Sequence, residues 1–398
     1  MAKIEVENLT KVFGKRPNRA INLLEQGKSK DEILKETGCT VGVNRTNFSV
    51  EAGEIFVIMG LSGSGKSTLV RLLNRLIDPT EGSVWVDGDD LARMDDKGLR
   101  KVRREKMSMV FQQFGLFPFR TILDNVAYGL EIQGLEDQDK KKKAEDALQL
   151  VGLGGYGNMY PDELSGGMQQ RVGLARALAA DTDILLMDEA FSALDPLIRK
   201  EMQDELLELQ ERMQKTIVFI THDLDEALRL GDRITIMKDG RIVQIGTPED
   251  ILQHPADDYV AQFVEDVDRS KVFTAEAVMK RPETLTIDKD GPRVALQRMK
   301  KEGISSLYVT NKDRTLLGIV HADEVSELVE QGSEDMRSVL HENVPAVQKD
   351  TVVKEMIELL TYKNTPVAVV DEDNRLVGIV VRGSVMALLS GKEVEAVE

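Results

Sequence analysis

A short glycine-rich segment constrains this chain more than any other feature of its sequence. Residues 60–68 read GLSGSGKST and fit the pattern G-x-x-x-x-G-K-[ST]. The segment follows the apolar run 54–59 and precedes residues 69–76, where apolar side chains have helical spacing. A strand, a glycine-rich loop and a helix in this order predict an α/β domain with an anion-binding loop at the helix N-terminus.

The residue types in this loop are those that hold a nucleoside triphosphate. Glycines let the backbone N–H groups turn inward around phosphate oxygens. Lys66 is long enough to reach the β- and γ-phosphates, and the Ser67 hydroxyl is a suitable Mg²⁺ ligand. The alternative, a glycine-rich turn without a ligand, leaves the flanking strand and helix unexplained. The predicted binding residues are Gly60, Ser62, Gly63, Ser64, Gly65, Lys66, Ser67 and Thr68.

A second segment places carboxylates at the end of a predicted strand. Residues 184–187, ILLM, form a short apolar run typical of a buried parallel strand, and Asp188 and Glu189 follow it. We predict that Asp188 holds Mg²⁺ and that Glu189 polarises the water that attacks the γ-phosphate. The alternative interpretation is an acidic pair at the protein surface, which would be the usual explanation of an Asp-Glu pair found without other motifs. His222 follows another apolar run, 216–221, but a lone histidine after a strand is more often structural than catalytic.

Composition limits the classes of protein that remain. The 398 residues suggest two to three domains, and no apolar run is long enough to span a bilayer. The first residues, MAKIEVE, alternate like a strand and do not resemble a signal peptide. The single cysteine, Cys39, excludes an intramolecular disulfide and fits a reducing cytoplasm. A net charge of −17 argues against nucleic acid as the main partner.

Together with further segments, these motifs resemble the ATP-binding-cassette (ABC) ATPases over about residues 1–270. Residues 164–178, LSGGMQQRVGLARAL, resemble the ABC signature and its helix. Residues 110–112, 192–195 and 221–223 resemble the Q-loop, the D-loop and the switch-histidine loop of that family. A P-loop ATPase outside the family would require the signature match to be a coincidence.

The resemblance implies a role for each matching residue. Glu189, His222 and Gln112 would be catalytic. Ser67, Gln112 and Asp188 would hold Mg²⁺. In this family two cassettes pack head to tail, so that each ATP lies between the P-loop of one subunit and the signature of the other. The remaining implied nucleotide contacts are Phe13, where the family stacks an aromatic ring on adenine, and Ser165, Gly166, Gly167 and Asp195.

The presence of a single cassette limits the classes of ABC protein to which this chain can belong. No sustained heptads lie between Lys66 and Asp188, which argues against chromosome-maintenance relatives with long coiled coils. Relatives in translation usually carry two cassettes in one chain. Residues 114–125, FGLFPFRTILDN, resemble a segment that in importers forms part of the groove for the permease. The alternative interpretation of this segment is that several of its residues belong to the hydrophobic core. The alternative function for the whole chain is that of a soluble ABC ATPase acting on macromolecules.

Residues 15–43 occupy a place where a plain cassette has a short hairpin. Residues 20–24 have helical apolar spacing, Ser29 with Glu32 forms a capping-box pattern, and Gly38 is a natural residue after a helix C-terminus. The segment therefore predicts two short helices. It resembles an insertion in the ATPases of glycine betaine importers, and a functionally neutral insertion is the alternative.

The sequence after about residue 270 contains an internal repeat. Residues 303–320 overlay residues 363–380, with Gly318 matching Gly378 at an offset of 60. Each copy reads strand, helix, strand, turn, strand, helix. Such self-similarity indicates a duplicated module rather than a linker.

The duplicated module resembles a tandem pair of CBS domains, at residues 275–332 and 336–391, whose cleft often binds adenine nucleotides. The first copy has Asp323 where an acidic residue commonly contacts a ribose, and the second has Gly383 there. A role in dimerisation alone is the alternative. Basic residues near the first copy suit a phosphate or an anionic lipid, with a solvated helix face as the alternative: Arg293, Arg298, Lys300 and Lys301.

These observations predict an α/β protein, with an ABC-type P-loop nucleotide-binding domain (residues 1–270) followed by a tandem CBS (α/β) module. The resemblance implies the ATP-hydrolysing motor of an importer for glycine betaine or related quaternary-amine osmoprotectants, with ATP and Mg²⁺ as cofactors. The implied partners are a membrane permease, an extracytoplasmic substrate-binding component and a second copy of this chain, without nucleic acid, at the cytoplasmic face of the cell membrane. The CBS pair would regulate transport through cyclic di-AMP, ionic strength or both.

Overall fold

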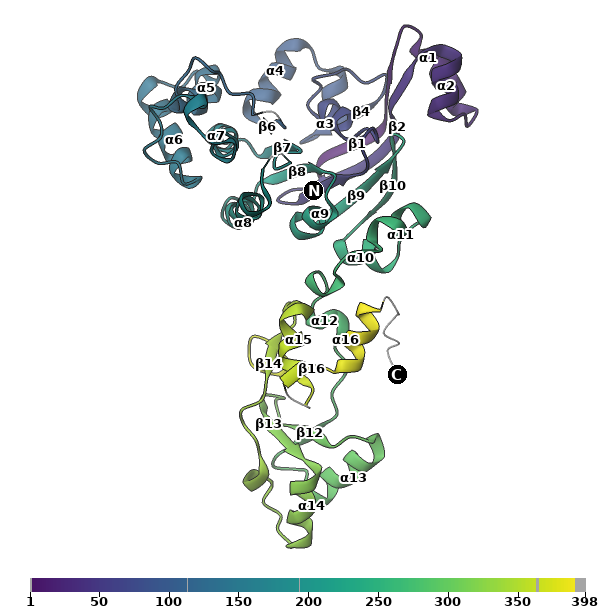
Figure 1. The fold of residues 1–398 in the computed structure, drawn as a ribbon, viewed down its shortest axis with the longest axis vertical. Helices are drawn as coiled ribbons and strands as arrows, with labels where there is room; N and C mark the ends of the chain where they lie inside the picture. The colour runs from purple at the N-terminus through teal and green to yellow at the C-terminus, as the bar shows by residue number, and fades with distance from the viewer. Residues whose placement is uncertain (1, 113, 193, 363–364, 391–398) are drawn as a thin grey trace. The chain divides into compact units, whose positions relative to one another are not determined.

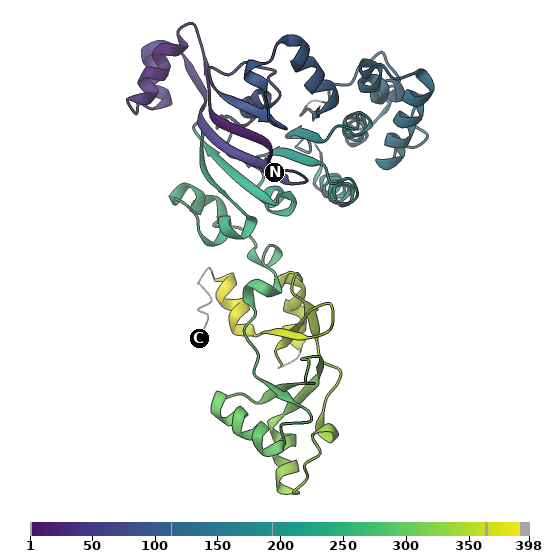
Figure 2. The ribbon, with the colours of Figure 1, turned by 180° about the vertical axis from the view of Figure 1, so that it is seen from behind.

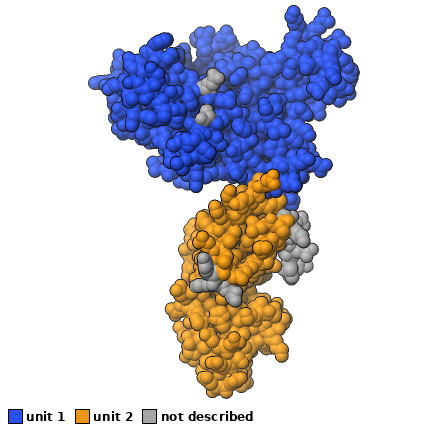
Figure 3. Space-filling model, in the orientation of Figure 1, with its two compact units in different colours: residues 1–265 blue, residues 266–398 orange. Residues whose placement is uncertain are grey.

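A computed structural model describes residues 2–112, 114–192, 194–362 and 365–390. Parts of four predicted segments lie outside the described residues: Met1 of the first strand, Ala193 of the D-loop, residues 363–364 of the repeat and residue 391 of the second CBS domain. The chain forms two compact units, residues 1–265 and 266–398 (Figure 3). Among the described residues, no helix is both long and apolar enough to cross a membrane.

A six-stranded sheet carries the centre of the first unit, in the strand order β10-β9-β3-β8-β7-β6 (Figure 1). All neighbours in it are parallel except β9 and β10, which are antiparallel. Every residue of β3, β7 and β8 is buried, because helices or the second sheet cover both faces of these apolar runs. The strands are β3 (Ile55–Met59), β6 (Met107–Val110), β7 (Ile184–Asp188), β8 (Thr216–Thr221), β9 (Arg233–Lys238) and β10 (Arg241–Gly246).

A four-stranded antiparallel sheet, in the order β2-β1-β4-β5, packs against the first sheet. Apolar residues of both sheets and of α3 (Lys66–Leu73) form one buried cluster. Within it, the rings of Phe48 and Phe56 stack with centroids 5.2 Å apart. The four strands are β1 (Ala2–Phe13), β2 (Thr40–Glu51), β4 (Glu81–Val86) and β5 (Asp89–Asp90).

Several helices of this unit pack on the six-stranded sheet, and α5, α6 and α7 pack against one another beyond its β6 edge (Figures 1 and 2). The helix after the glycine-rich loop begins and ends three residues earlier than the predicted 69–76. It ends at Leu73 because Arg75 adopts a positive φ of 50°, which no α-helix continues. The other helices are α4 (Asp96–Glu105), α5 (Ile122–Gln133), α6 (Asp137–Leu150), α7 (Gly166–Ala179), α8 (Pro196–Met213), α9 (Leu224–Leu230), α10 (Pro248–Gln253) and α11 (Asp258–Val264).

Residues 15–43 contain two helices, α1 (Pro17–Glu25) and α2 (Lys30–Thr37), beside the ends of β1 and β2 (Figure 1). Both bonds of the capping box are present at Ser29, and Gly38 ends α2 in the left-handed conformation. Apolar side chains of both helices pack with residues of the two strands in a separate cluster: Val12, Ala20, Ile21, Leu23, Leu24, Ile33, Cys39 and Val41.

The second unit contains two three-stranded sheets with the same topology, β11-β12-β13 and β14-β15-β16. The pairing of Val309 with Gly318 in the first sheet recurs as Val369 with Gly378 in the second. Side chains of both sheets share one apolar cluster. The elements are β11 (Thr284–Thr286), α13 (Pro292–Glu302), β12 (Ser306–Thr310), β13 (Leu316–His321), α14 (Ala322–Glu330), β14 (Ala346–Gln348), α15 (Val353–Tyr362), β15 (Val367–Val370), β16 (Leu376–Val380) and α16 (Arg382–Leu389).

The segment that precedes each repeat pairs with the other repeat. Lys280, after α12 (Ala275–Val278), bridges Ile379, and His341, after the short helix Met336–Val339, bridges Ile319. A Cβ at Gly318 would lie 2.4 Å from the carbonyl oxygen of His341, and one at Gly378 would lie 2.4 Å from the sulfur of Met279. The two matching glycines therefore make room for the crossing segments, which join the repeats into one unit.

Candidate functional site

The glycine-rich loop joins the central strand β3 to the N-terminus of α3. Gly60 has a φ of +151°, and a Cβ there would lie 2.3 Å from the carbonyl oxygen of Met237. Gly65 has a φ of +109°, and its Cβ would lie 2.3 Å from the carbonyl oxygen of Gly42. Only glycine fits at these two positions, so the pattern in the sequence corresponds to a backbone shape that side chains would prevent.

Lys66 is the buried cation of this loop. Its side chain is 5% exposed, and the ammonium donates hydrogen bonds to the carbonyl oxygens of Gly60 (2.7 Å) and Leu61 (3.2 Å). The ammonium also lies 4.0 Å from Oε1 of Glu189. Burial lowers the pKa of Lys66, while Glu189 and Asp188 act in the opposite direction. A buried ammonium in this position is suited to an anion arriving at the loop.

Ser67 and Asp188 meet although 121 positions separate them in the sequence. The Ser67 hydroxyl donates a 3.0 Å hydrogen bond to Oδ1 of Asp188, which ends β7. Burial raises the pKa of the Asp188 carboxyl, and the bond from Ser67 partly offsets that effect. A hydroxyl and a buried carboxylate at this distance are hard oxygen ligands of the kind that Mg²⁺ prefers, so the residues present fit that ion.

Glu189 lies at the centre of the predicted catalytic residues. Nε2 of Gln112 donates a hydrogen bond to its Oε2 over 3.1 Å, and Nδ1 of His222 lies 3.5 Å from the same oxygen. Glu189 has a positive φ of 47°, and its N–H donates to the carbonyl oxygen of Ile220. A non-glycine residue in this conformation costs free energy, which places a strained backbone at the predicted base.

A pocket opens between the loop and the ends of β1 and β2. The predicted residues that line it are Phe13, Ser62, Gly63, Gly65, Lys66, Ser67, Thr68 and Glu189. Two residues of the predicted loop, Gly60 and Ser64, do not line the pocket. Gly60 lies against the backbone of Met237, and the N–H of Ser64 donates to the carbonyl oxygen of Leu61. The Ser64 hydroxyl is buried and has no hydrogen-bond partner among the described residues.

The pocket also contains residues that the sequence reasoning missed, namely Lys30, Thr40, Val41 and Gly42. A Cβ at Gly42 would lie 2.8 Å from the ring of Phe13 and 3.0 Å from Cγ2 of Thr68. Gly42 therefore allows the half-exposed Phe13 ring to lie beside the loop. The glycine belongs to no motif, and only its position at the edge of the insertion distinguishes it in the sequence.

The signature residues do not line this pocket. Ser165 caps α7, where its Oγ accepts a hydrogen bond from the N–H of Met168, and Gly166 and Gly167 form the first turn. Asp195 caps α8 by accepting from the N–H groups of Leu197 and Ile198. The residues of the signature turn thus lie outside the pocket that the P-loop of their own chain lines.

A second, mostly apolar hollow lies between α4, α5, α7 and the β6 strand. Leu76, Phe111, Tyr128 and Ile132 line it, together with three arginines. Among the described residues, none of those at 114–125 lines this hollow. The arginines are Arg103, Arg104 and Arg176.

The loop at 114–120 is held beside this hollow by polar anchors. Arg176 donates to the carbonyl oxygens of Phe114 (3.0 Å) and Gly115 (2.7 Å). Asn125 is fully buried, accepts from the N–H of Phe117 and donates back to its carbonyl oxygen. In this loop the Phe119 side chain is 94% exposed.

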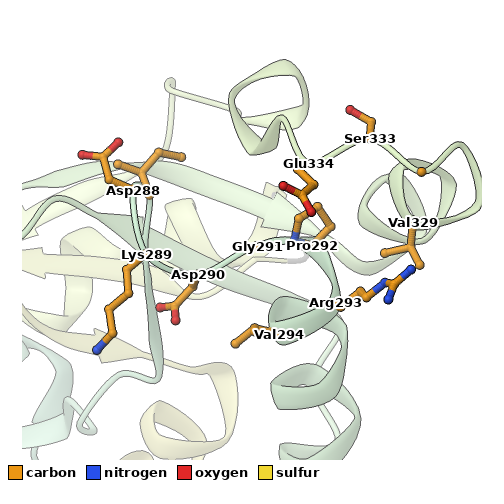
Figure 4. A pocket seen from close by; sticks show the side chains of 12 residues that line it. Asp288, Lys289, Asp290, Gly291, Pro292, Arg293, Val294, Val329, Ser333 and Glu334 are labelled. Carbon is orange, nitrogen blue, oxygen red and sulfur yellow. The ribbon is translucent and has the colours of Figure 1, made fainter.

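In the second unit, a pocket lies between the start of α13 and the end of α14 (Figure 4). Its charged lining residues are of both signs: Asp288, Lys289, Asp290, Arg293 and Glu334. Asp290 forms an ion pair with Arg298, whose side chain does not line this pocket. Asp323, in the first turn of α14, does not line this pocket, and a Cβ at Gly383 would meet open space.

Family models match both units. The ABC transporter model matches residues 43–192, and the CBS domain model matches residues 275–330 and 336–391. The predicted fold class, an ABC-type nucleotide-binding domain followed by tandem CBS domains, is thereby confirmed.

Two curated relatives match nearly end to end. The chain is 62% identical over 394 residues to the glycine betaine/carnitine transport ATP-binding protein GbuA of Listeria monocytogenes, covering 99% of each chain. It is 59% identical to the glycine betaine transport ATP-binding protein OpuAA of Bacillus subtilis, covering 98% of this chain and 93% of that protein. The solved dimer of the ATP-binding cassette MJ0796 with ADP and Pi matches at a TM-score of 0.53 and 34% identity, covering 62% of this chain and 98% of that one.

Proposed function

This chain belongs to the family of ABC transporter ATP-binding subunits, in the group of glycine betaine transport proteins, and we propose that it hydrolyses ATP to drive import of glycine betaine or a related quaternary amine. The resemblance predicted from the sequence is thereby confirmed at the level of the family. The observation that carries the solute assignment is the identity of 62% over both full lengths, which includes the insertion and the CBS pair.

The chemistry follows from residues that the fold brings to one place. Lys66 meets the phosphates with its ammonium, and the loop N–H groups hold them at the N-terminus of α3. Ser67, Asp188 and Gln112 hold Mg²⁺, which neutralises charge on the phosphate oxygens when bound. Glu189 takes the proton of the attacking water, and His222 and Gln112, both near its carboxylate, orient that carboxylate toward the γ-phosphate.

Two copies of the chain form the working site in this proposal. The signature residues Ser165, Gly166 and Gly167 lie outside the pocket of their own chain, and a helix N-terminus of this kind is suited to the γ-phosphate held by a second copy. Asp195, at the start of α8, would lie at the same junction. The cassette dimer solved with ADP and Pi supports an arrangement of two copies.

The apolar hollow and the exposed Phe119 supply the surface for a membrane partner. A permease helix with apolar side chains would bury Leu76 and Ile132 in the hollow, while its backbone and acidic groups would meet the three arginines. The chain would then lie at the cytoplasmic face of the membrane, with an extracytoplasmic component delivering the solute. Closure of the two cassettes around ATP would move this surface and the permease with it.

The CBS pair would adjust transport in response to cyclic di-AMP, ionic strength or both. The described residues that line the ATP pocket all belong to the first unit, and two copies of the CBS pair in a dimer would present a two-fold cleft suited to a two-fold symmetric ligand. Asp323 remains the proposed ribose contact of the first copy. A role in dimerisation alone is the alternative for this unit.

Reconstitution with the permease tests the function. Vesicles that contain both proteins should accumulate glycine betaine only when ATP is supplied on the side of this chain. Uptake of a sugar with no response to betaine would contradict the solute and leave the ATPase assignment intact. The competing function, a soluble ABC ATPase acting on macromolecules, would be supported if the native chain co-purified with ribosomes or DNA and with no membrane protein.

A further inference from the structure

Lys30, from the insertion, lies in the nucleotide pocket together with residues of the P-loop. It is the first residue of α2, immediately after the capping Ser29. Its side chain lines the same pocket as Phe13, Gly63 and Thr68. The side chain extends over Gly240, where an added Cβ would lie 3.3 Å from Cε of the lysine. None of the motifs recognised in the sequence includes Lys30.

The insertion holds this lysine in place. Ile33, one turn further along α2, is fully buried in the cluster that joins both insertion helices to β1 and β2. The capping box at Ser29 fixes the backbone at the start of α2, and Lys28 forms an ion pair with Glu36. Because β1 ends at Phe13 and β2 begins at Thr40, the same cluster positions Lys30 relative to the predicted adenine-binding ring.

The ammonium of Lys30 lacks the partners that a half-buried cation requires. Burial lowers its pKa, and the nearby carboxylates of Asp239 and Asp31 act in the opposite direction. Within the described part of the chain, this ammonium has no hydrogen bond or ion pair, whereas that of Lys66 donates to two carbonyl oxygens. A partly desolvated cation without a partner is costly, and an arriving anion would remove that cost.

The position of Lys30 indicates which part of a nucleotide it meets. Gly63 and Lys30 both line the nucleotide pocket. They also line a second hollow, which lies between the insertion and residues 238–243. A Cβ at Gly63 would meet nothing within 4 Å, so this part of the loop backbone borders open space. Since the loop backbone is the part of the site that cradles phosphates, a lysine that shares this pocket with Gly63 and Thr68 lies near the expected position of the phosphate chain.

We propose that Lys30 contacts the phosphate chain of the bound nucleotide, so that the insertion supplies a second lysine to the ATP site. This inference rests on the proposed function only in that the pocket binds a nucleoside triphosphate. The insertion then contributes directly to nucleotide affinity in this group of transporters. A cassette that lacked the insertion would lack this contact.

Nucleotide binding to the full-length chain tests the proposal without the permease or the solute. The probes are non-hydrolysable analogues of ATP and GTP, titrated calorimetrically with Mg²⁺. Lys30→Met should weaken both analogues by about tenfold, the loss expected for one charge-assisted contact. The difference from the parent should shrink at high salt, because the contact is partly exposed. Lys30→Arg should restore most of the affinity.

The control is Lys35→Met, which removes an exposed lysine from the same helix. It should bind both analogues as the parent does, and the melting temperatures of all variants should agree. Lys30→Gln, which keeps a polar side chain, replaces Lys30→Met if the latter unfolds. Unchanged affinity in the Lys30 variants would overturn the proposal, and so would a loss confined to the ATP analogue, since that would indicate a base contact. A failure of betaine uptake would leave these results unaffected.

Discussion

Nε2 of Gln112 donates a 3.1 Å hydrogen bond to the carboxylate of Glu189, across 77 positions of sequence. The bond joins the end of β6 to the end of β7, which are parallel neighbours in the six-stranded sheet. The same carboxylate oxygen lies 3.5 Å from Nδ1 of His222, after β8. Three adjacent strands therefore bring three side chains to the place where the γ-phosphate is expected.

Replacing Glu189 with Gln should abolish turnover while nucleotide binding persists. The amide keeps the size of the side chain but cannot accept the proton of the attacking water, so the rate should fall by at least about 100-fold. Phosphate release and ATP binding measured on the same preparation check this expectation. Glu211→Gln, an exposed position on α8, is the matched control. Turnover near the parent rate would show that Glu189 is not the base.

An acidic residue in the apolar hollow should break the contact with the permease. Ile132 is 39% exposed at the end of α5, and an aspartate there would have to be desolvated beneath an apolar partner. We expect Ile132→Asp to keep the ATPase activity of the isolated chain and to lose co-purification with the permease. Leu150→Asp, on α6 at 48% exposure, should change neither. Retained co-purification of Ile132→Asp would place the interface elsewhere.

Glu226 should make the stability of the first unit depend on pH. Burial raises the pKa of its carboxyl, and hydrogen bonds from Thr221 and Gln203 only partly offset that effect. The ionised carboxyl therefore destabilises the fold above its raised pKa, and this cost disappears as the pH falls toward the ordinary value of 4.5. Glu226→Gln should raise the melting temperature by a few degrees at neutral pH.

The gain from Glu226→Gln should shrink as melting is repeated at progressively lower pH. The exposed Glu211 on α8 provides the comparison, since Glu211→Gln should leave the pH profile of melting unchanged. An equal gain for Glu226→Gln at every pH would mean that packing, and not the carboxyl charge, causes the effect.

A chain that ends at Glu265 should transport without regulation. The first compact unit ends at this residue, and the short helix Arg269–Lys271 already packs on α15 and α16 of the second unit. Uptake in reconstituted vesicles should persist, while inhibition by cyclic di-AMP and the response to salt should be lost. If cyclic di-AMP still inhibited the truncated chain, the CBS pair would not be the site of this regulation.

Much of the fold and the site could be predicted because their signals are local. The P-loop glycines, the apolar strand runs and the capping box at Ser29 depend on neighbours within a few residues, and the structure shows them where the sequence indicated. The offset between Gly318 and Gly378 likewise revealed the repeat. The end of α3 was less predictable, since the positive φ of Arg75 has no counterpart in the apolar pattern.

What the sequence by itself determined is therefore the set of motif residues and their local backbone shapes. Only the tertiary structure decided that Lys30 and Gly42 line the nucleotide pocket, and that the first segment of each CBS domain pairs with a strand of the other domain. The physical reason is that periodicity and turn chemistry act between residues close in sequence. Contacts between distant segments depend instead on how whole elements pack, and a single sequence carries no local signal for that packing.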